Sequence, residues 1–220
     1  MSNDAAEIVW TIVVAGGTGS RFGRAKQFDL IGTRRVIDHA ADAARLASDG
    51  VVLVVPPADV ASEGGVAGGT TRCESVRAGL AAVPSEATII CVHDAARPFA
   101  SAHLFAAVIE AVAQGADGAV PGVAVTDTIK RIDTDSVVVE TPPRETLVAV
   151  QTPQAFRASA LRAAHASGPE ATDDAALVES CGGVVVVVAG ELTNRKITHL
   201  DDLAWARDQA DPDQATGLRR

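Results

Sequence analysis

Short apolar runs recur along this chain, and turn residues or segments with helical spacing separate them. The clearest runs are residues 8–14, 51–55, 88–92 and 184–189. Continuous runs of this length are typical of strands buried on both faces of a parallel sheet. We expect helices at residues 36–48, 72–82, 101–114, 158–167 and 173–180, and another from about residue 201. The alternation predicts a Rossmann-like α/β fold with a mostly parallel sheet and helices on both faces.

Two further segments lie between these elements, one a predicted strand and the other a predicted loop. Residues 116–125 have strand character, although Pro121 and Gly122 are expected to force a bend or bulge there. Residues 64–71 are rich in glycine and are predicted to form a loop. In such sheets the ligand binds at the carboxyl ends of the strands, and the loops of unusual composition in this chain all follow predicted strands.

Residues 126–151 break the alternation. Strand-forming residues alternate there with turn residues, and no helical stripe is present. The segment predicts a protruding β-hairpin arm. Because a bare arm buries little surface by itself, we expect it to pack against a second subunit. The predicted organisation is one domain over residues 1–220, with a dimerisation arm at about 126–151.

Composition restricts the partners and the location of the protein. The chain has 220 residues and a formal net charge of −9, which argues against nucleic acid as a partner because phosphate neutralisation needs a basic face. No apolar segment reaches the length of a membrane span, and the first seven residues lack the positive charge of a signal peptide. The chain has an odd number of cysteines, and they are widely spaced: Cys73, Cys91 and Cys181. This usage suits a reducing cytoplasm.

A glycine-rich turn follows the first apolar run. Gly16, Gly17 and Gly19 stand within four residues, and Arg21, Arg24 and Lys26 follow without any carboxylate. Backbone amides in such a turn form a concave site for anions, and the cations favour phosphate. The alternative is a tight turn with solvated cations. Neither the dinucleotide fingerprint nor the nucleoside-triphosphatase loop is present, so a phosphate site here belongs to another class.

A second cluster of polar residues follows the run at 88–92. Asp94 at this strand end is suited to a magnesium ion, which takes few carboxylates and completes its shell with phosphate and water. The alternative for Asp94 is a helix cap or a turn. His93 is more simply a structural residue, and Arg97 could pair with Asp94 or bind an anionic substrate.

The remaining candidates carry little information alone. Gly68 and Gly69 form a common type of small-residue loop, and the cations of the arm suit a solvated hairpin. Lys196 is an ordinary surface lysine unless something anionic lies near it.

Together these motifs resemble the 2-C-methyl-D-erythritol 4-phosphate cytidylyltransferase family over residues 9–207. The motifs are Ala-Gly-Gly-x-Gly-x-Arg…Lys-Gln, Gly-Gly-x-x-Arg-x-x-Ser-Val, His-Asp-Ala-Ala-Arg-Pro, Asp-Thr-Ile-Lys, Thr-Pro-Gln, Thr-Asp-Asp-Ala and Asn-x-Lys-Ile-Thr. The hexamer at 93–98 is the most specific of them. Three departures from the family pattern are Ala25 in place of proline, Thr70 in place of an acidic residue, and Arg195 in place of an apolar one.

The resemblance implies a role for each matching residue. Nucleotide contacts would come from Ala15, Gly16, Gly17, Gly19, Gly69, Thr70 and Ser75. Catalytic charge would come from Arg21, Lys26, Lys196 and Asp94, with Asp94 also holding Mg²⁺. Contacts to methylerythritol phosphate would come from Arg97, Thr128, Arg144, Thr152 and Thr172, of which Thr128 and Arg144 would be supplied by the arm of the partner in a homodimer.

The implied reaction joins CTP and methylerythritol phosphate and releases pyrophosphate, as a step of non-mevalonate isoprenoid biosynthesis. The substrates are small molecules, and neither nucleic acid nor membrane takes part. Two alternatives stay open: a cytidylyltransferase for another polyol phosphate such as ribitol 5-phosphate, and a nucleotide-sensing module without turnover. Ala95 and Ala96 favour the erythritol enzyme over the ribitol one, and the complete set of Lys26, Asp94 and Lys196 argues against a pure sensor.

Overall fold

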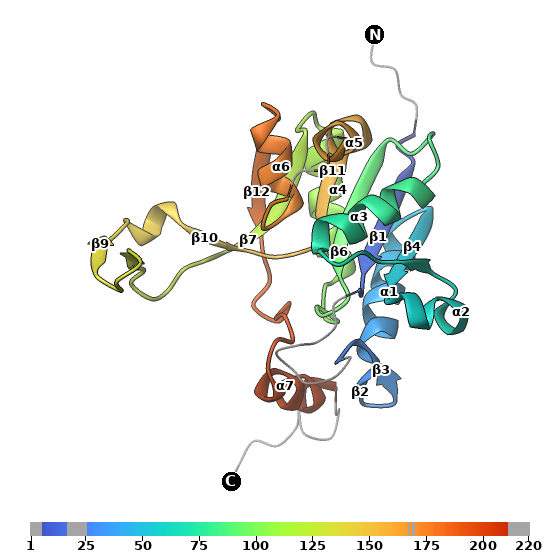
Figure 1. The fold of residues 1–220 in the computed structure, drawn as a ribbon, viewed down its shortest axis with the longest axis horizontal. Coiled ribbons are helices and arrows are strands. Elements are labelled where there is room, and N and C mark those ends of the chain that lie inside the picture. The colour runs from blue at the N-terminus through green and yellow to red at the C-terminus, as the bar shows by residue number, and fades with distance from the viewer. Residues whose placement is uncertain (1–5, 17–25, 167, 169, 211–220) are drawn as a thin grey trace.

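The computed structural model describes residues 6–16, 26–166, 168 and 170–210. Its centre is a sheet with strand order β10-β7-β11-β6-β1-β4-β5, and β12 pairs with β7 (Figure 1). The strands of this sheet are β1 (Val9–Val14), β4 (Gly50–Val55), β5 (Val66–Ala67), β6 (Ile89–Asp94), β7 (Gly118–Ala124), β10 (Val148–Val150), β11 (Gln154–Arg157) and β12 (Val185–Ala189). Two short pairs lie outside it: β2 (Leu30–Ile31) with β3 (Arg34–Arg35), and β8 (Arg131–Ile132) with β9 (Val138–Glu140).

The helices are close to those expected. They are α1 (Val36–Ala47), α2 (Val60–Glu63), α3 (Arg72–Ala82), α4 (Ala102–Ala113), α5 (Ala158–His165), α6 (Asp174–Ser180) and α7 (Leu200–Ala210), with short 3-10 turns at Lys26–Phe28, Pro57–Asp59 and Arg144–Thr146. Ser101 caps α4, since its hydroxyl accepts from the backbone N–H of Leu104. Within the described residues, no helix has the length and apolar character that crossing a membrane requires.

The sheet is mostly parallel, as expected. β1 pairs in parallel with β4 and β6, and β7 pairs in parallel with β12. β10 and β11 are antiparallel to their neighbours, and β11 was not predicted because its four residues carry no periodic pattern. The expected loop at 64–71 also contains the short strand β5, which pairs with the end of β4.

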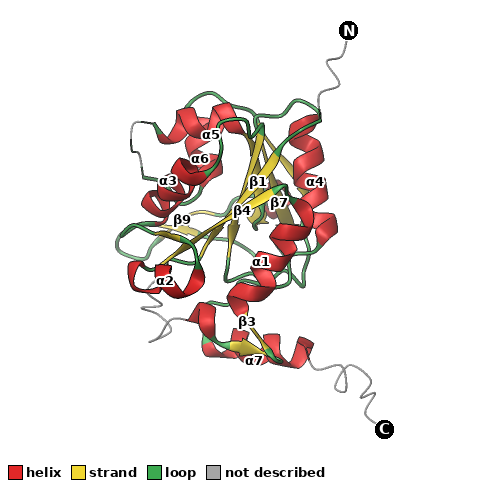
Figure 2. Cartoon of the chain, turned by 90° about the vertical axis from the view of Figure 1, so that its right-hand side faces the viewer, coloured by secondary structure: helices red, strands yellow, loops and turns green. Residues whose placement is uncertain are grey.

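Helices cover both faces of the sheet, as expected (Figure 2). Successive residues of a strand point to opposite faces, so Ile12 packs with α3, α5 and α6 while Val13 packs with α1 and α4. Cys91 is fully buried within the second of these cores, in agreement with its apolar sequence context.

We expected Pro121 and Gly122 to force a bend or a bulge, and the pairing with β12 contains no bulge there. The pairing of β7 with β12 runs through both residues without a shift in register. On its other side, β7 pairs with β11 at Gly118 and Ala119 and with β10 from Gly122 onward. Pro121 therefore stands where one antiparallel partner gives way to the next, and a strand can accommodate proline at such a gap.

The segment after β7 leaves the body of the molecule. Figure 1 shows β8 and β9 standing away from the main sheet. The bounds differ from the expected 126–151, because Val148–Val150 pair with β7 as strand β10 of the main sheet. We use "arm" below for residues 125–147, which lie between β7 and β10.

A small third core lies beside the main body. Ile31, Val36, Ile197, Leu203 and Ala206 are buried together there. It joins α7 to the β2–β3 pair and to the chain that follows β12. Its position matters for the site, since the chain bearing Lys196 runs directly into it.

Candidate active site

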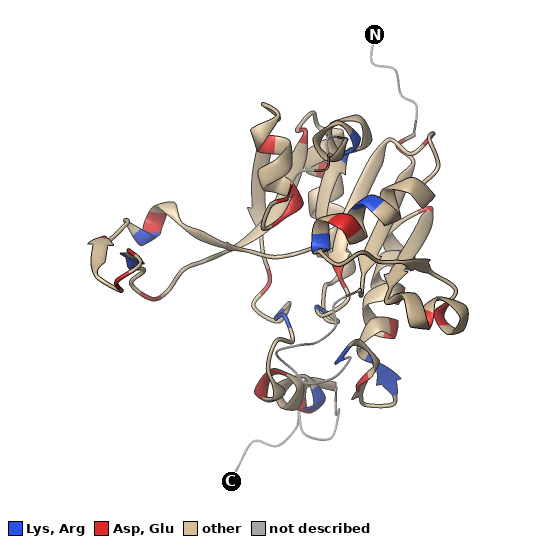
Figure 3. Cartoon of the chain, in the orientation of Figure 1, with Lys and Arg blue, Asp and Glu red and all other residues tan. Residues whose placement is uncertain are grey.

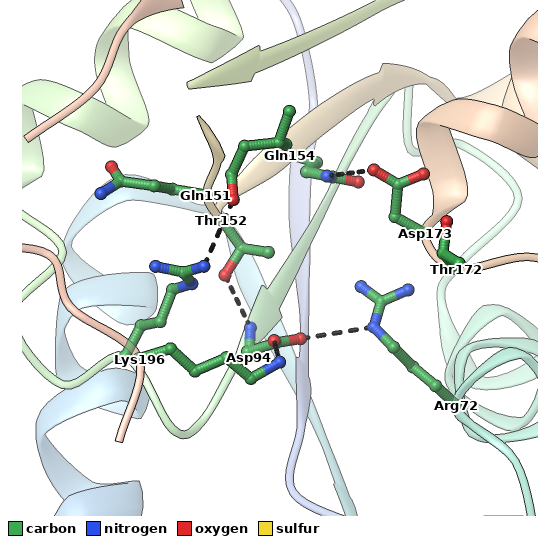
Figure 4. Close-up of a pocket in the computed structure, with 10 residues that line it drawn as sticks. Arg72, Asp94, Gln151, Thr152, Gln154, Thr172, Asp173 and Lys196 are labelled. Carbon is green, nitrogen blue, oxygen red and sulfur yellow. Dashed lines mark hydrogen bonds and ion pairs between the residues drawn. The ribbon is translucent and has the colours of Figure 1, made fainter. Parts of the chain in front are cut away.

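A cavity of about 240 Å³ opens among the chain segments at the carboxyl end of β6 (Figure 4). Ten residues line it: Arg72, Asp94, Arg97, Val150, Gln151, Thr152, Gln154, Thr172, Asp173 and Lys196. Five of them, Asp94, Arg97, Thr152, Thr172 and Lys196, were candidates from four separate sequence motifs. The volume lies below the range of about 300–1,000 Å³ typical of sites for drug-sized ligands, so the cavity suits a small substrate.

Asp94 lies at the centre of the charged groups. Its Oδ2 accepts from Lys196 Nζ at 2.6 Å, and its Oδ1 from Arg72 Nε at 3.4 Å (Figure 4). Although burial alone raises the pKa of Asp94, the charges of Arg72 and Lys196 outweigh it and hold this pKa well below its usual range. Asp94 is therefore a carboxylate at neutral pH.

Arg72 connects Asp94 to a deeper carboxylate. Its Nη1 donates to Asp174 Oδ2 at 2.7 Å, and Asp174 is fully buried. His165 Nε2 donates to the other oxygen of Asp174 at 2.9 Å. Four side chains thus form a continuous chain of hydrogen bonds and ion pairs from the core to the cavity.

Thr152 is held by a buried pair of hydrogen bonds. Its hydroxyl accepts from the backbone N–H of Asp94 at 3.0 Å and donates to His93 Nδ1 at 3.1 Å. His93 Nε2 in turn donates to the carbonyl of Arg97 at 3.1 Å. Burial lowers the pKa of His93 to about 4, so the ring is neutral and has a structural role, as the sequence suggested.

Arg97 is half-buried, and its side chain donates to backbone carbonyls. Its Nη1 donates to the carbonyl of Asn194 at 2.8 Å, and its Nη2 to that of Val150 at 3.4 Å. Burial lowers the pKa of Arg97. Because both of these bonds go to neutral carbonyls, its charge favours an anion in the cavity.

The loop bearing Lys196 is tied to the turn before β11. Gln151 Nε2 donates to the carbonyl of Glu191 at 2.8 Å, and Gln151 Oε1 accepts from the backbone N–H of Glu191 at 3.0 Å. Asn194 Nδ2 donates to the carbonyl of Thr152 at 2.9 Å. Both amide side chains are buried, so the loop is held by a packed polar network.

Lys26 lies next to the same loop. Its Nζ donates to the carbonyl of Ile197 at 2.6 Å, one residue beyond Lys196. Figure 3 shows Lys and Arg positions gathered between the lower end of the sheet and α7. The two lysines expected to act on phosphate therefore belong to adjoining segments.

The start of the glycine-rich turn meets the second glycine loop. A side chain added at Gly16 would come within 3.1 Å of Ser75 Oγ, and Ser75 Oγ accepts from the backbone N–H of Gly69 at 3.2 Å. Ala15 is buried beside them. Thr70 differs, since its exposed hydroxyl donates to Glu74 at 2.6 Å. Gly17, Gly19 and Arg21 lie outside the described residues.

Thr128 and Arg144 do not join the cavity. Both are exposed on the arm, and Arg144 Nη1 donates to the carbonyl of Thr126 at 2.9 Å. Figure 1 shows the arm extended away from the sheet. Within one chain, these two candidates and the cavity are separate.

Five cavity residues had no predicted role: Arg72, Val150, Gln151, Gln154 and Asp173. Arg72, Gln154 and Asp173 stand inside motifs quoted above, so their motifs were visible in the sequence although their roles were not. Asp173 caps α6 and also accepts from Gln154 Nε2 at 3.1 Å. Val150 and Gln151 follow the arm and carry no local signal.

A metal ion would have few carboxylates to bind in the described part of the chain. No group of three or more His, Cys, Asp or Glu side chains is arranged for a metal among these residues. Magnesium can be held by one carboxylate together with phosphate oxygens and water. Asp94 fits that pattern, provided that a metal displaces Lys196 from Oδ2.

Comparison with known proteins identifies the family. A family model described as 2-C-methyl-D-erythritol 4-phosphate cytidylyltransferase matches residues 9–209. The chain belongs to this family. A relative of that name from Carboxydothermus hydrogenoformans is 40% identical, with 91% of this chain and 94% of the relative covered. The family member from Rubrobacter xylanophilus is 41% identical, with 89% and 91% covered.

Solved structures of the family share the fold. The crystal structure of 2-C-methyl-D-erythritol 4-phosphate cytidylyltransferase from Thermus thermophilus matches with a TM-score of 0.79 and 37% identity, over 93% of this chain and 99% of that one. Other relatives are longer. The bifunctional enzyme IspD/IspF of Nitratidesulfovibrio vulgaris is 43% identical over 89% of this chain but only 56% of its own length. The chain thus spans about half the length of the first curated relatives it matches.

Proposed function

We propose that this chain transfers a cytidylyl group from CTP to 2-C-methyl-D-erythritol 4-phosphate. The observation that carries the proposal is the convergence of Asp94, Arg97, Thr152, Thr172 and Lys196 on one small cavity. These residues come from separate motifs of a family that is named for this activity. The cavity offers cations for a phosphate and hydroxyl groups for a polyol. The product would enter isoprenoid biosynthesis.

In the proposed reaction, an oxygen of the 4-phosphate attacks the α-phosphorus of CTP in line. A new P–O bond forms, the bond from the α-phosphorus to the bridging oxygen breaks, and pyrophosphate leaves with the electron pair. The attacking oxygen is already anionic near neutral pH, so no general base is required. Lys26 and Lys196, with Arg21, would offset the charge that develops on the α-phosphate.

The nucleotide would lie along the two glycine loops. The contact between Gly16 and Ser75 and the bond from Gly69 to Ser75 support a shared wall for CTP. Ala15, Gly17, Gly19 and Thr70 complete the proposed set, although the Thr70 hydroxyl is engaged with Glu74. Mg²⁺ bound at Asp94 would neutralise phosphate charge when the nucleotide is present.

We also propose a homodimer in which each arm delivers Thr128 and Arg144 to the cavity of the partner. Arg144 makes no cavity contact in its own chain, and apolar side chains of the arm are exposed. A cytoplasmic location is proposed as well, because all three cysteines are unpaired.

A substrate panel tests the function. Purified protein with CTP and magnesium is supplied with methylerythritol phosphate, ribitol 5-phosphate or glycerol 3-phosphate, and pyrophosphate release is followed. We expect release with methylerythritol phosphate at a kcat/KM at least tenfold above that of the other two. Preference for ribitol 5-phosphate would favour the alternative that the chain is a ribitol 5-phosphate cytidylyltransferase. CTP binding without pyrophosphate release would favour the sensing module.

Lys196→Ala tests the catalytic assignment. We expect kcat to fall about 10²-fold or more, since removing one preorganised electrostatic group has effects of this size. The melting temperature should change little, because the Lys196 side chain is 45% exposed. Arg45→Ala is the control, as it removes an exposed cation of α1 that pairs only with the surface residue Asp42 among the described residues. Wild-type kcat in Lys196→Ala would remove this lysine from the mechanism.

A further inference from the structure

Arg72 lies between the carboxylate of Asp94, which lines the cavity, and that of Asp174, which is fully buried. It is the first residue of α3, and its planar guanidinium reaches Asp94 through Nε (Figure 4). Through Nη1 the same guanidinium reaches Asp174. Asp174 is fully buried, and His165 holds its second oxygen. The side chain of Arg72 is 24% exposed, and it lines the cavity.

The buried carboxylate of Asp174 fixes the orientation of the Arg72 guanidinium. Asp174 cannot move freely, because its oxygens are bound by Arg72 and His165 and its backbone begins α6. The guanidinium is a rigid fork, so anchoring Nη1 also fixes the direction of Nε. Asp94 therefore receives one hydrogen bond from a rigid donor and another from the flexible Lys196.

We propose that Arg72 is a positioning residue for the reaction, which holds the Asp94 carboxylate in a fixed orientation at the cavity. The inference rests on the proposed function, since Asp94 and Lys196 are placed there at the reacting phosphates. Arg72 acts through Asp94 and is not itself assigned a contact with substrate. An error of about 1 Å in the placement of such a group can cost about 10²-fold in rate.

A structural role for Arg72 makes a different prediction. If Arg72 only neutralises the buried Asp174, then any cation at this position should suffice. A lysine has one nitrogen at the end of a flexible chain, so it can neutralise Asp174 but cannot also hold Asp94 in the same fixed geometry. The variant Arg72→Lys therefore separates the two roles.

We expect Arg72→Lys to lower kcat at least tenfold, while KM for CTP stays within threefold and the melting temperature within a few degrees. The matched control is Arg77→Lys on the same helix, where Arg77 pairs with Glu170 at the surface. It should keep kcat within twofold. Wild-type kcat in Arg72→Lys would overturn the proposal.

A double variant covers the case in which Arg72→Lys fails to fold. Arg72→Gln combined with Asp174→Asn removes both partners of the buried ion pair, so no carboxylate is left unpaired in the core. A purely structural role predicts that this protein regains wild-type kcat. The positioning role predicts that kcat stays at least tenfold low, because Asp94 still lacks its rigid donor.

A spectroscopic measurement separates this inference from the proposed function. The N–H signal of Arg72 Nε, assigned by its loss in Arg72→Lys, should shift in Asp94→Asn and exchange slowly in the wild type. An unchanged signal in Asp94→Asn would overturn the Arg72–Asp94 contact whether or not the protein has turnover. Failure of the proposed function appears separately, as wild-type protein that releases no pyrophosphate with any substrate of the panel.

Discussion

At the scale of single residues, a buried neutral histidine supports the edge of the cavity. His93 accepts from the Thr152 hydroxyl and donates to the Arg97 carbonyl, so both ring nitrogens are used in one tautomer. A second proton would have to displace the Thr152 hydroxyl from Nδ1. The network therefore depends on His93 staying neutral.

This arrangement predicts a loss of stability in mild acid. The pKa of His93 falls from 6.5 to about 4 on folding, so the unfolded chain takes up the proton first as the pH drops. The stabilisation is fully present above pH 6.5 and is lost as the pH falls toward 4, by about 3 kcal/mol in the free energy of unfolding. Urea unfolding at pH 7, 5.5 and 4.5 measures this loss in the free energy of unfolding.

His93→Gln is the control for this pH dependence. The variant is less stable at pH 7, but the slope of its stability between pH 6.5 and 4 should be shallower than that of the wild type. Carboxylates whose pKa is lowered on folding, such as Asp94, also lose stabilisation near the acid end of this window, but they do so in both proteins, so the difference between the two slopes reports His93. Equal slopes in the two proteins would contradict the assignment to His93.

At the scale of elements, α7 and the small third core hold two segments of the site together. Ile197 is buried there, its N–H donates to the carbonyl of Ala96, and its carbonyl accepts from Lys26. Leu203 of α7 packs into the same core. The packing of α7 thus positions both Lys26 and the loop of Lys196.

Leu203→Ala tests this link. A leucine buried to this degree typically contributes about 2–5 kcal/mol relative to alanine. We expect α7 to loosen, its amide hydrogens to exchange faster, and kcat to fall about tenfold. Leu200→Ala on the same helix is the matched control, since Leu200 is 63% exposed; its exchange and kcat should stay at wild-type values. If α7 loosens and kcat stays normal, the packing of α7 does not position the site.

At the scale of the whole molecule, the arm is a projecting segment with several solvent-exposed apolar side chains. Ile132, Val137, Val138 and Val139 are each more than half exposed. A patch of this kind on a projecting hairpin favours an interface with another copy of the chain. Such an interface would also bring Arg144 to an anionic substrate, which it does not reach in one chain.

Mixing two inactive variants tests the proposed arm exchange. Arg144→Ala and Lys26→Ala should each have little activity alone. In a mixed dimer, one site of the two keeps both residues intact, so random exchange at equal amounts should restore about one quarter of wild-type activity. Light scattering should show a dimer. No recovery after demonstrated subunit exchange, or an active monomer, would exclude a shared site.

The sequence by itself determined the local features of this protein. The bounds of α3 and the start of α4 follow from apolar spacing and from the Ser101 cap, because helices and caps depend on residues only a few positions apart. The phosphate-type glycine loop, Asp94 and Lys196 were likewise visible as motifs. What such motifs could not show was which of them would meet.

Only the tertiary structure decided the partners within the site. Lys196 and Asp94 are 102 positions apart in sequence, and so are Arg72 and Asp174. The antiparallel strand β11, which places Thr152 against Asp94, is set by its pairing with β6 and β7. These contacts arise when strands and helices pack into one sheet and its two covering layers. Their stability comes from burial and long-range pairing, which no local pattern of residues encodes.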